Sequence, residues 1–312
     1  MRYPIPMTRA LLLAFILLGS SSLSIAQTPP SQPDLATWRA KRAADISAPD
    51  GWLSLVALGW LKDGDNSIGS AEDNSIRIAN NPPARVPDHL CVLTVAAGHI
   101  TLHSPASGFP AGFFLDSQPP AEAILRPDDE PHPSVLATEN LRLVLLHRGD
   151  RYALRVKDAD SPARTAFRGL HWYAPDPRFH VTAKWIPFTP PHTEQVPTAI
   201  GTTLALTAPG LAEVTLDGKT VQLEPVLEGD DHKQLFFILR DATSRTTTYE
   251  ASRFLYTGLP SNGIDQPGTL DIDFNRLENP PCAYTPYATC PLPPYINRLP
   301  ISIPAGEQRY NR

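Results

Sequence analysis

The stretch LRLVLLHRGDRYALRVKD, residues 141–158, shows most clearly how this chain folds. Two runs rich in apolar residues, Leu141 to Arg148 and Arg151 to Asp158, flank the pair Gly149-Asp150. Glycine can take the positive φ that a type II′ turn needs at its first central position. The stretch therefore predicts a β-hairpin.

The same kind of pattern continues along most of the chain. Beyond Asp50, short runs rich in Val, Ile, Leu, Phe, Thr and Tyr are separated by turn residues roughly every eight to twelve positions. Asp217-Gly218 indicates a second hairpin, of type I′. Leu235 to Arg240 forms a continuous apolar run, and Thr246 to Tyr256 could pair back against it. This spacing is typical of an antiparallel sandwich or barrel.

The beginning of the chain has a different character. Arg2 and Arg9 precede the apolar run Ala10 to Leu18, and small residues follow as far as Ala26. This order predicts a secretory signal peptide over residues 1–26, cut after Ala26. Nine apolar residues are too few to cross about 30 Å of hydrocarbon. We therefore expect a secreted or periplasmic protein with no membrane span after cleavage.

Proline-rich stretches suggest how the rest of the chain is divided. Pro187 to Pro197 and Pro280 to Pro304 cannot supply the N–H donors of a central strand. The predicted fold class is mainly β, with antiparallel sandwich-like or barrel-like sheets. The chain could form two β-rich halves or one continuous domain. We expect a linker and N-terminal helix at 27–49, with the helix itself over Leu35 to Ile46. A β-rich half follows at 50–190. A second β-rich half at 191–312 ends in a Pro-rich, disulfide-braced segment.

Composition and motifs exclude several functions. The 312 residues contain 27 Lys and Arg against 32 Asp and Glu, a formal charge of -5. Nucleic-acid binding needs a net basic face, so this balance argues against it. Lipase-type G-x-S-x-G, P-loop and dinucleotide-binding glycine motifs are absent. These absences remove the common labelled enzyme classes and leave open a hydrolase of another type.

Two of the three cysteines lie close together in the C-terminal Pro-rich segment. Seven residues separate Cys282 from Cys290, which is not a zinc spacing. In an oxidising compartment such a pair is expected to form a structural disulfide, which would stabilise the loop by about 2.5 kcal/mol. A redox-active pair is the alternative. Cys91, which lies among apolar residues, is expected to be a buried apolar residue.

Several segments together resemble the domain-of-unknown-function family 1684 (DUF1684). The resemblance runs from about Trp38 to Glu307, and the sequence around the cysteines is its most specific part. It implies a coherent folded unit and no known activity, cofactor or catalytic residue. The segments that carry it are Asp50 to Val56, Arg148 to Tyr152, Arg253 to Tyr256, Asp273 to Asn275, and the cysteine loop through Pro300.

A shorter stretch, Gly64 to Ile78, is similar to the opening of forkhead-associated phosphothreonine-binding domains. Those domains place an arginine where this chain has Ser70, and a Ser-Arg-x-His stretch where it has Ala84 to Pro87. Without these groups most of the charge-assisted recognition of a phosphate is lost. We interpret the similarity as a shared β-hairpin pattern.

The strand Leu270 to Asn275 offers the best candidate for chemistry. Alternation places Asp271, Asp273 and Asn275 on one face, with neighbours about 7 Å apart. Such a row could hold a hard cation such as Ca²⁺, or act as an acid/base pair. An antiparallel return would bring Arg253 near it, and the following segment adds further polar groups. The candidate ligand-binding residues are Arg253, Asp271, Asp273, Asn275, Asn279, Asn297 and Arg298.

Three functions are compatible with this arrangement. The first is binding of a small-molecule or carbohydrate-like ligand at a polar cleft near the C-terminal strands. The second is a hydrolase that uses Asp271 and Asp273 as acid and base. The third is a structural or interaction protein without a pocket, in which the same residues form ion pairs. A separate anion-binding face could be formed by the alternating residues Arg151, Arg155 and Lys157.

Overall fold

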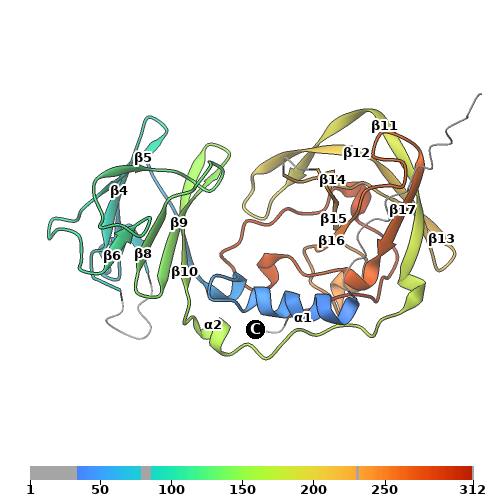
Figure 1. Ribbon diagram of the computed structural model, residues 1–312, viewed down its shortest axis with the longest axis horizontal. Helices are drawn as coiled ribbons and strands as arrows, with labels where there is room; N and C mark the ends of the chain where they lie inside the picture. The colour runs from blue at the N-terminus through green and yellow to red at the C-terminus, as the bar shows by residue number, and fades with distance from the viewer. Residues whose placement is uncertain (1–33, 79–85, 230–231, 311–312) are drawn as a thin grey trace, which may run out of the picture. The chain divides into compact units, whose positions relative to one another are not determined.

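The computed structural model describes residues 34–78, 86–229 and 232–310 (Figure 1). The signal peptide predicted for residues 1–26 lies outside the described residues, so export stays a prediction. In the part of the chain that is described, no helix is long and apolar enough to cross a membrane. Leu35–Arg312 forms one compact unit.

The hairpin predicted at residues 141–158 is confirmed. Strands β9 (Leu141–Arg148) and β10 (Arg151–Asp158) pair along their whole length, and Gly149 has a φ of 66°. This hairpin is the centre of a five-stranded sheet in the order β1-β10-β9-β8-β6. Its other strands are β1 (Leu55–Trp60), β8 (Val135–Thr138) and β6 (Phe113–Leu115).

A second sheet packs with the first around a shared apolar core. Its order is β3-β2-β4-β5-β7, and buried leucines from both sheets, such as Leu93 and Leu143, belong to one cluster. Cys91 is also buried there, as predicted. The strands are β3 (Ile76–Arg77), β2 (Gly64–Gly69), β4 (Cys91–Ala96), β5 (His99–His103) and β7 (Ala123–Leu125).

The pairing of β2 with β3 corrects one interpretation of the sequence. The two strands run parallel, with Ile68 opposite Ile76. The stretch that resembles forkhead-associated domains is therefore not a hairpin. After Gly69 the chain loops back to the level of Ile68 before it enters β3. Strand β3 therefore runs beside β2 in the same direction.

The C-terminal part of the chain contains two further sheets (Figure 1). The order β13-β12-β11-β17 is built on a long antiparallel ribbon of β11 and β12, and Trp185 on β11 is fully buried in its core. Asp217 and Gly218 both have positive φ, which confirms the second hairpin. The strands are β11 (His180–Pro197), β12 (Thr203–Leu216), β13 (Lys219–Leu223) and β17 (Gly268–Asp273), and the smaller sheet contains β14 (Val226–Leu227), β15 (Leu235–Leu239) and β16 (Arg253–Thr257).

The proline-rich part of β11 shows how a strand accommodates these residues. The boundary expected between residues 190 and 191 falls inside this strand. β17 pairs only with His180 to Trp185, and the register against β12 shifts between Pro187 and His192. The proline-rich stretch therefore has a partner strand on one side only, where a missing N–H is tolerated.

Helix α1 (Leu35–Ile46) has the predicted bounds, and the segment after β17 is irregular. The predicted mainly β fold class is thus confirmed. Isolated bridges such as Arg240 with Arg298 attach the C-terminal segment to the sheets. The remaining short elements are η1 (Trp52–Ser54), α2 (Pro162–Thr165), η2 (Pro177–Phe179), η3 (Ala242–Arg245), η4 (Phe274–Arg276), η5 (Pro281–Ala283) and η6 (Tyr295–Asn297).

The two C-terminal cysteines approach each other, but the predicted disulfide is not formed in this structure. The backbone N–H of Cys282 donates to Sγ of Cys290 at 3.1 Å, and Sγ of Cys282 lies 3.6 Å from the carbonyl oxygen of Ala288. Each sulfur therefore lies close to a backbone group of the same loop.

Candidate functional site

The predicted row of polar residues on β17 does not converge. Asp271 is exposed, and its Oδ1 lies 2.8 Å from Nε2 of His180. Asp273 accepts hydrogen bonds from the backbone N–H and Nδ2 of Asn275, at 3.0 and 2.9 Å. The alternation ends at Asp273 because η4 begins there, so Asn275 leaves the strand face and is buried.

Arg253 does not reach this row either. Its side chain is fully buried, forms an ion pair with Asp241 at 2.9 Å, and donates to the carbonyl oxygens of Ile303 and Ala305. These contacts fasten the C-terminal segment to β16. Of the other predicted residues, Asn297 is fully buried against backbone groups, and Nε of Arg298 donates to the carbonyl oxygen of Pro293 at 3.2 Å. These residues support the fold.

Asn279 alone among the seven predicted residues lines the pocket described next. Its side chain is buried, and Nδ2 donates to Oε1 of Glu307 at 2.9 Å and to the carbonyl oxygen of Gln308 at 2.8 Å. Its Oδ1 is buried without a hydrogen-bond partner among the described residues. An unpaired buried acceptor costs about 1–3 kcal/mol.

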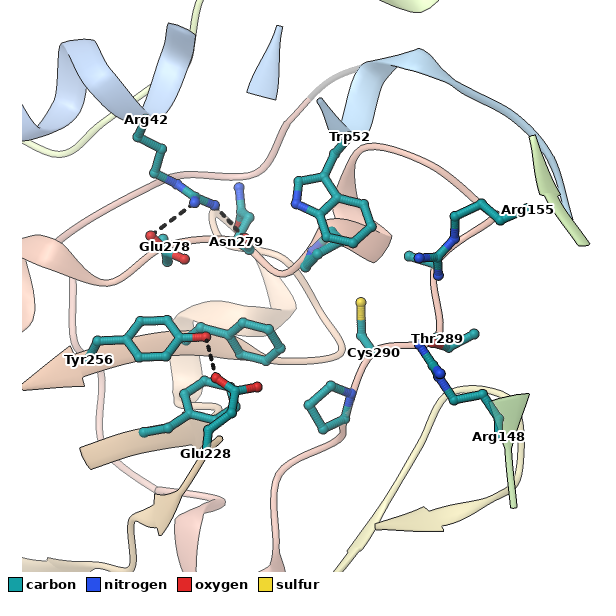
Figure 2. Close-up of a pocket in the computed structure, with 15 residues that line it drawn as sticks. Arg42, Trp52, Arg148, Arg155, Glu228, Tyr256, Glu278, Asn279, Thr289 and Cys290 are labelled. Atoms are coloured by element: carbon teal, nitrogen blue, oxygen red, sulfur yellow. Dashed lines mark hydrogen bonds and ion pairs between the residues drawn. The ribbon is translucent and has the colours of Figure 1, made fainter. Parts of the chain in front are cut away.

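The pocket has a volume of about 280 Å³ and combines an apolar surface with charged groups (Figure 2). Phe236 on β15 stacks on Tyr256 of β16, with ring centroids 4.6 Å apart. Phe254 meets Phe236 edge to face at 4.9 Å. Trp52 from η1 and the cysteine loop, residues 288–291, complete the lining. Rigid aromatic rings of this kind bind flat apolar groups at low entropic cost.

The acidic side of the pocket is formed by Glu278, next to Asn279. Its Oε2 lies 2.9 Å from Nη1 of Arg42, whose Nε is also paired with Glu307 at 3.0 Å. Burial raises the pKa of Glu278 to about 7, against the lowering effect of Arg42. Glu278 can therefore gain or lose a proton near neutral pH.

A second carboxylate, Glu228, lies near the aromatic surface. The hydroxyl of Tyr256 donates to its Oε2 at 3.4 Å, and this contact is drawn in Figure 2. Burial raises the pKa of Glu228, and the hydrogen bond from Tyr256 partly offsets that effect.

Two arginines reach the pocket from the hairpin β9–β10. In Figure 2, Arg148 and Arg155 lie on the side of the view away from Glu278. Arg148 is fully engaged, because two of its nitrogens donate to Asp128 at 2.8 and 2.6 Å. Arg155 lies over the ring of Trp52 at 5.6 Å, and its Nε is buried without a hydrogen-bond partner among the described residues. Burial lowers the pKa of Arg155, and nearby Arg148 adds to this effect.

The other residues of the predicted anion-binding face point to different contacts. Arg151 stacks over the ring of Trp60 at 3.9 Å, and Nζ of Lys157 donates to the carbonyl oxygen of Asp50 at 2.7 Å. The structure therefore places Arg155 in the pocket and keeps its two strand neighbours out of it. Sequence reasoning missed Glu228, Tyr256 and Glu278; the one available signal was the polar pair Glu278-Asn279 directly before the proline-rich cysteine loop.

Comparisons with known proteins identify a family for part of the chain and add no activity. Two solved structures are similar to parts of the chain. One is the solution NMR structure of an uncharacterized protein of Haloarcula marismortui, 28% identical with a TM-score of 0.40, covering 46% of this chain and 78% of that one. The other is the FhaA FHA domain complexed with the intracellular domain of Rv3910, 15% identical with a TM-score of 0.21, covering 31% of this chain and 96% of that one. Neither likeness supports a functional argument.

No curated protein matches the chain. Residues 165–308 match the family described as "Protein of unknown function (DUF1684)", a shorter stretch than the expected range from Trp38 to Glu307. The segment includes β11 to β17, Glu278 and the cysteine loop. The resemblance to the DUF1684 family, whose function is unknown, is therefore confirmed for residues 165–308.

Proposed function

We propose that the pocket binds a small organic anion, in which a carboxylate or phosphate group contacts Arg155 and an apolar body packs on the aromatic surface. The sequence predicted small-molecule binding near the C-terminal strands. The proposal restricts the ligand to a small organic anion and moves the site to the pocket that contains Arg155. The observation that carries it is the state of Arg155, a partly buried guanidinium without a hydrogen bond or ion pair to any described residue.

The balance of charge around the pocket supports an anionic ligand. Arg42 is matched by Glu278 and Glu307, and Arg148 is matched by Asp128. Nε of Arg155 is buried without a hydrogen-bond acceptor among the described residues. A guanidinium withdrawn from water without a partner is unfavourable, and its fixed donors suit a carboxylate or phosphate in two-point contact.

The size and surface of the pocket set limits on the rest of the ligand. A volume of about 280 Å³ is at the small end for ligand sites and fits a single-ring compound. Phe236, Tyr256 and Trp52 provide faces for such a ring. The third function considered from the sequence, a structural protein without a pocket, has less support because a pocket with an unmatched charge is present.

The proposal can be tested with benzoate and phenyl phosphate, each titrated into the full chain by isothermal calorimetry. We expect Arg155→Gln to weaken the tighter-binding probe by about 10-fold to 100-fold, the effect of losing charged hydrogen bonds worth about 1.5–3 kcal/mol. Arg151→Gln is the matched control, because Arg151 is on the same strand and stacks on Trp60 outside the pocket. No binding to the wild type, or equal loss in both variants, would refute the proposal.

A hydrolase remains the second candidate, with a different acid/base from the one predicted. Glu278 is buried in the pocket and has a pKa of about 7, which suits general acid or base catalysis at neutral pH. Asp271 is exposed and lies outside this pocket. Turnover of nitrophenyl esters or phosphates by the wild type, abolished in Glu278→Gln, would support this function; turnover that survives the change would exclude this role for Glu278.

Export is the remaining part of the proposal. A signal peptide cut after Ala26 would place the pocket in contact with solutes outside the cytoplasm. Expression of the full-length chain with its native N-terminus, followed by N-terminal sequencing of the secreted or periplasmic fraction, tests this. A protein recovered only inside cells with residues 1–26 intact would overturn it.

A further inference from the structure

A second cluster of ionisable side chains lies outside the pocket, where β11 runs close to the end of β13. His192 and Glu194 are two residues apart on β11, so their side chains share one face of the strand. Glu224 directly follows the last residue of β13. One ligand atom from each of the three residues lies within 4.8 Å of the other two.

Two of the distances between these atoms are close to those around a metal ion. Nε2 of His192 lies 3.1 Å from Oε1 of Glu224 and 3.7 Å from Oε2 of Glu194. Zinc binds nitrogen and oxygen ligands at about 2.0–2.2 Å in tetrahedral geometry, which places neighbouring ligand atoms about 3.3–3.6 Å apart. The observed separations lie on either side of that range, so small side-chain rotations would complete the set.

The burial of Glu224 also favours a bound cation. Its side chain is only 8% exposed, and the side-chain partner of its carboxylate is His192. A carboxylate largely withdrawn from water and close to a second carboxylate on Glu194 is electrostatically unfavourable. A divalent cation at this point would satisfy both carboxylates together.

Glu224 is also held firmly in place. The fully buried side chain of Asn297 accepts a hydrogen bond from the backbone N–H of Glu224 at 2.8 Å and donates to its carbonyl oxygen at 2.8 Å. His192 is fixed from the other side, since β11 resumes pairing with β12 at His192 opposite Ala208. Such support from surrounding groups is what orients the ligands in metal sites.

We propose that His192, Glu194 and Glu224 form a binding site for a divalent transition metal, with Zn²⁺ as the metal that fits the ligands best. Imidazole with two carboxylates suits zinc, whereas calcium takes six to eight oxygen ligands. The side chains of His192 and Glu194 are 45% and 28% exposed, so the fourth coordination position faces solvent. Three protein ligands with one open position is the arrangement of catalytic zinc sites.

The test is calorimetric titration of ZnCl₂ into the full chain after treatment with a chelator and dialysis. We expect the wild type to bind one Zn²⁺ per chain. In His192→Ala and Glu224→Gln, zinc affinity should fall by more than about 100-fold, which is a larger loss than altering a residue outside the ligand set would cause. The matched control is His180→Ala. His180 is on the same strand and pairs with exposed Asp271 at 2.8 Å, and it has no place in the three-residue set.

Folding of the variants is checked by circular dichroism, and Glu194→Gln provides a variant at a more exposed position if Glu224→Gln fails to fold. We expect Zn²⁺ to raise the Tm of the wild type and of His180→Ala, and to leave the Tm of Glu194→Gln unchanged. The proposal is overturned if the wild type binds no zinc, if the ligand variants bind it as tightly as the control, or if Ca²⁺ binds in place of Zn²⁺.

Discussion

The change Glu278→Gln should make the stability of the protein less dependent on pH. Burial raises the pKa of Glu278 from its ordinary 4.5 to about 7. Between these two values the folded protein holds a proton that the unfolded chain has released, so the free energy of unfolding falls as pH rises. The contribution of this group is complete below pH 4.5 and lost above about pH 7.

The two pKa values set the size of the effect. Their difference corresponds to about 3 kcal/mol of stability lost between about pH 4.5 and about pH 7.5 through this one group. Glutamine carries no titratable proton, so the variant lacks that contribution. The carbonyl oxygen of the new amide side chain can still accept a hydrogen bond from Arg42, and Arg42 keeps its second partner, Glu307, at 3.0 Å. The change therefore removes the titratable proton of residue 278 and keeps the size of the side chain and its contact with Arg42.

Urea unfolding at a series of pH values from about 4.5 to about 8 measures this effect. Because other groups titrate in the same range, the quantity to compare is the wild-type free energy of unfolding minus that of the variant. This difference should fall by about 3 kcal/mol across the range. Glu250→Gln is the control, because Glu250 is a largely exposed partner of Arg309. A difference that stays flat with pH for Glu278→Gln would refute the assignment of a buried, proton-binding carboxyl.

Three further changes test the structural roles assigned above. Arg253→Met should lower the free energy of unfolding by about 3–5 kcal/mol, because it leaves Asp241 buried without its cation; a loss below about 1 kcal/mol in urea unfolding would contradict this role. Asp271→Asn should change stability by less than about 1 kcal/mol in the same assay, since its pair with His180 is exposed. Exposure to oxidised glutathione should join Cys282 to Cys290, seen by mass spectrometry as the loss of two hydrogens; unchanged, fully alkylatable thiols would show that the predicted disulfide cannot form.

The parts of the fold that could be predicted are those set by neighbours in the sequence. The turn at Gly149 and the turn at Asp217-Gly218 each define a hairpin within a few residues, and both are present with the expected φ values. Helix α1 was predicted for the same reason. The parallel pairing of β2 with β3 was not, because the path of the chain between two strands depends on contacts that local patterns do not encode.

The pocket could not be predicted from the sequence because its residues come from distant segments. Arg42 is on α1, Trp52 is on η1, and Arg155 is on β10, while Tyr256 and Glu278 are about 100 residues or more further along the chain. Alternation along a strand shows which side chains share a face, and it gave the correct faces on β17 as far as Asp273. It does not show what packs against that face, and this decides whether a charge is paired.

Arg253 and Arg155 show how the surroundings of a buried charge decide its role. Both are arginines in apolar strands, and from the sequence Arg253 was the stronger candidate for a ligand contact. In the fold, Nη1 and Nη2 of Arg253 are taken up by Asp241 and two backbone carbonyl groups. Its Nε has no hydrogen-bond partner among the described residues, but the side chain is fully buried and does not line the pocket. Arg155 lies at a pocket with donors that the described residues do not use. A buried charge is evidence for a ligand only after its own partners have been counted, and by that measure Arg155 marks the site to test first.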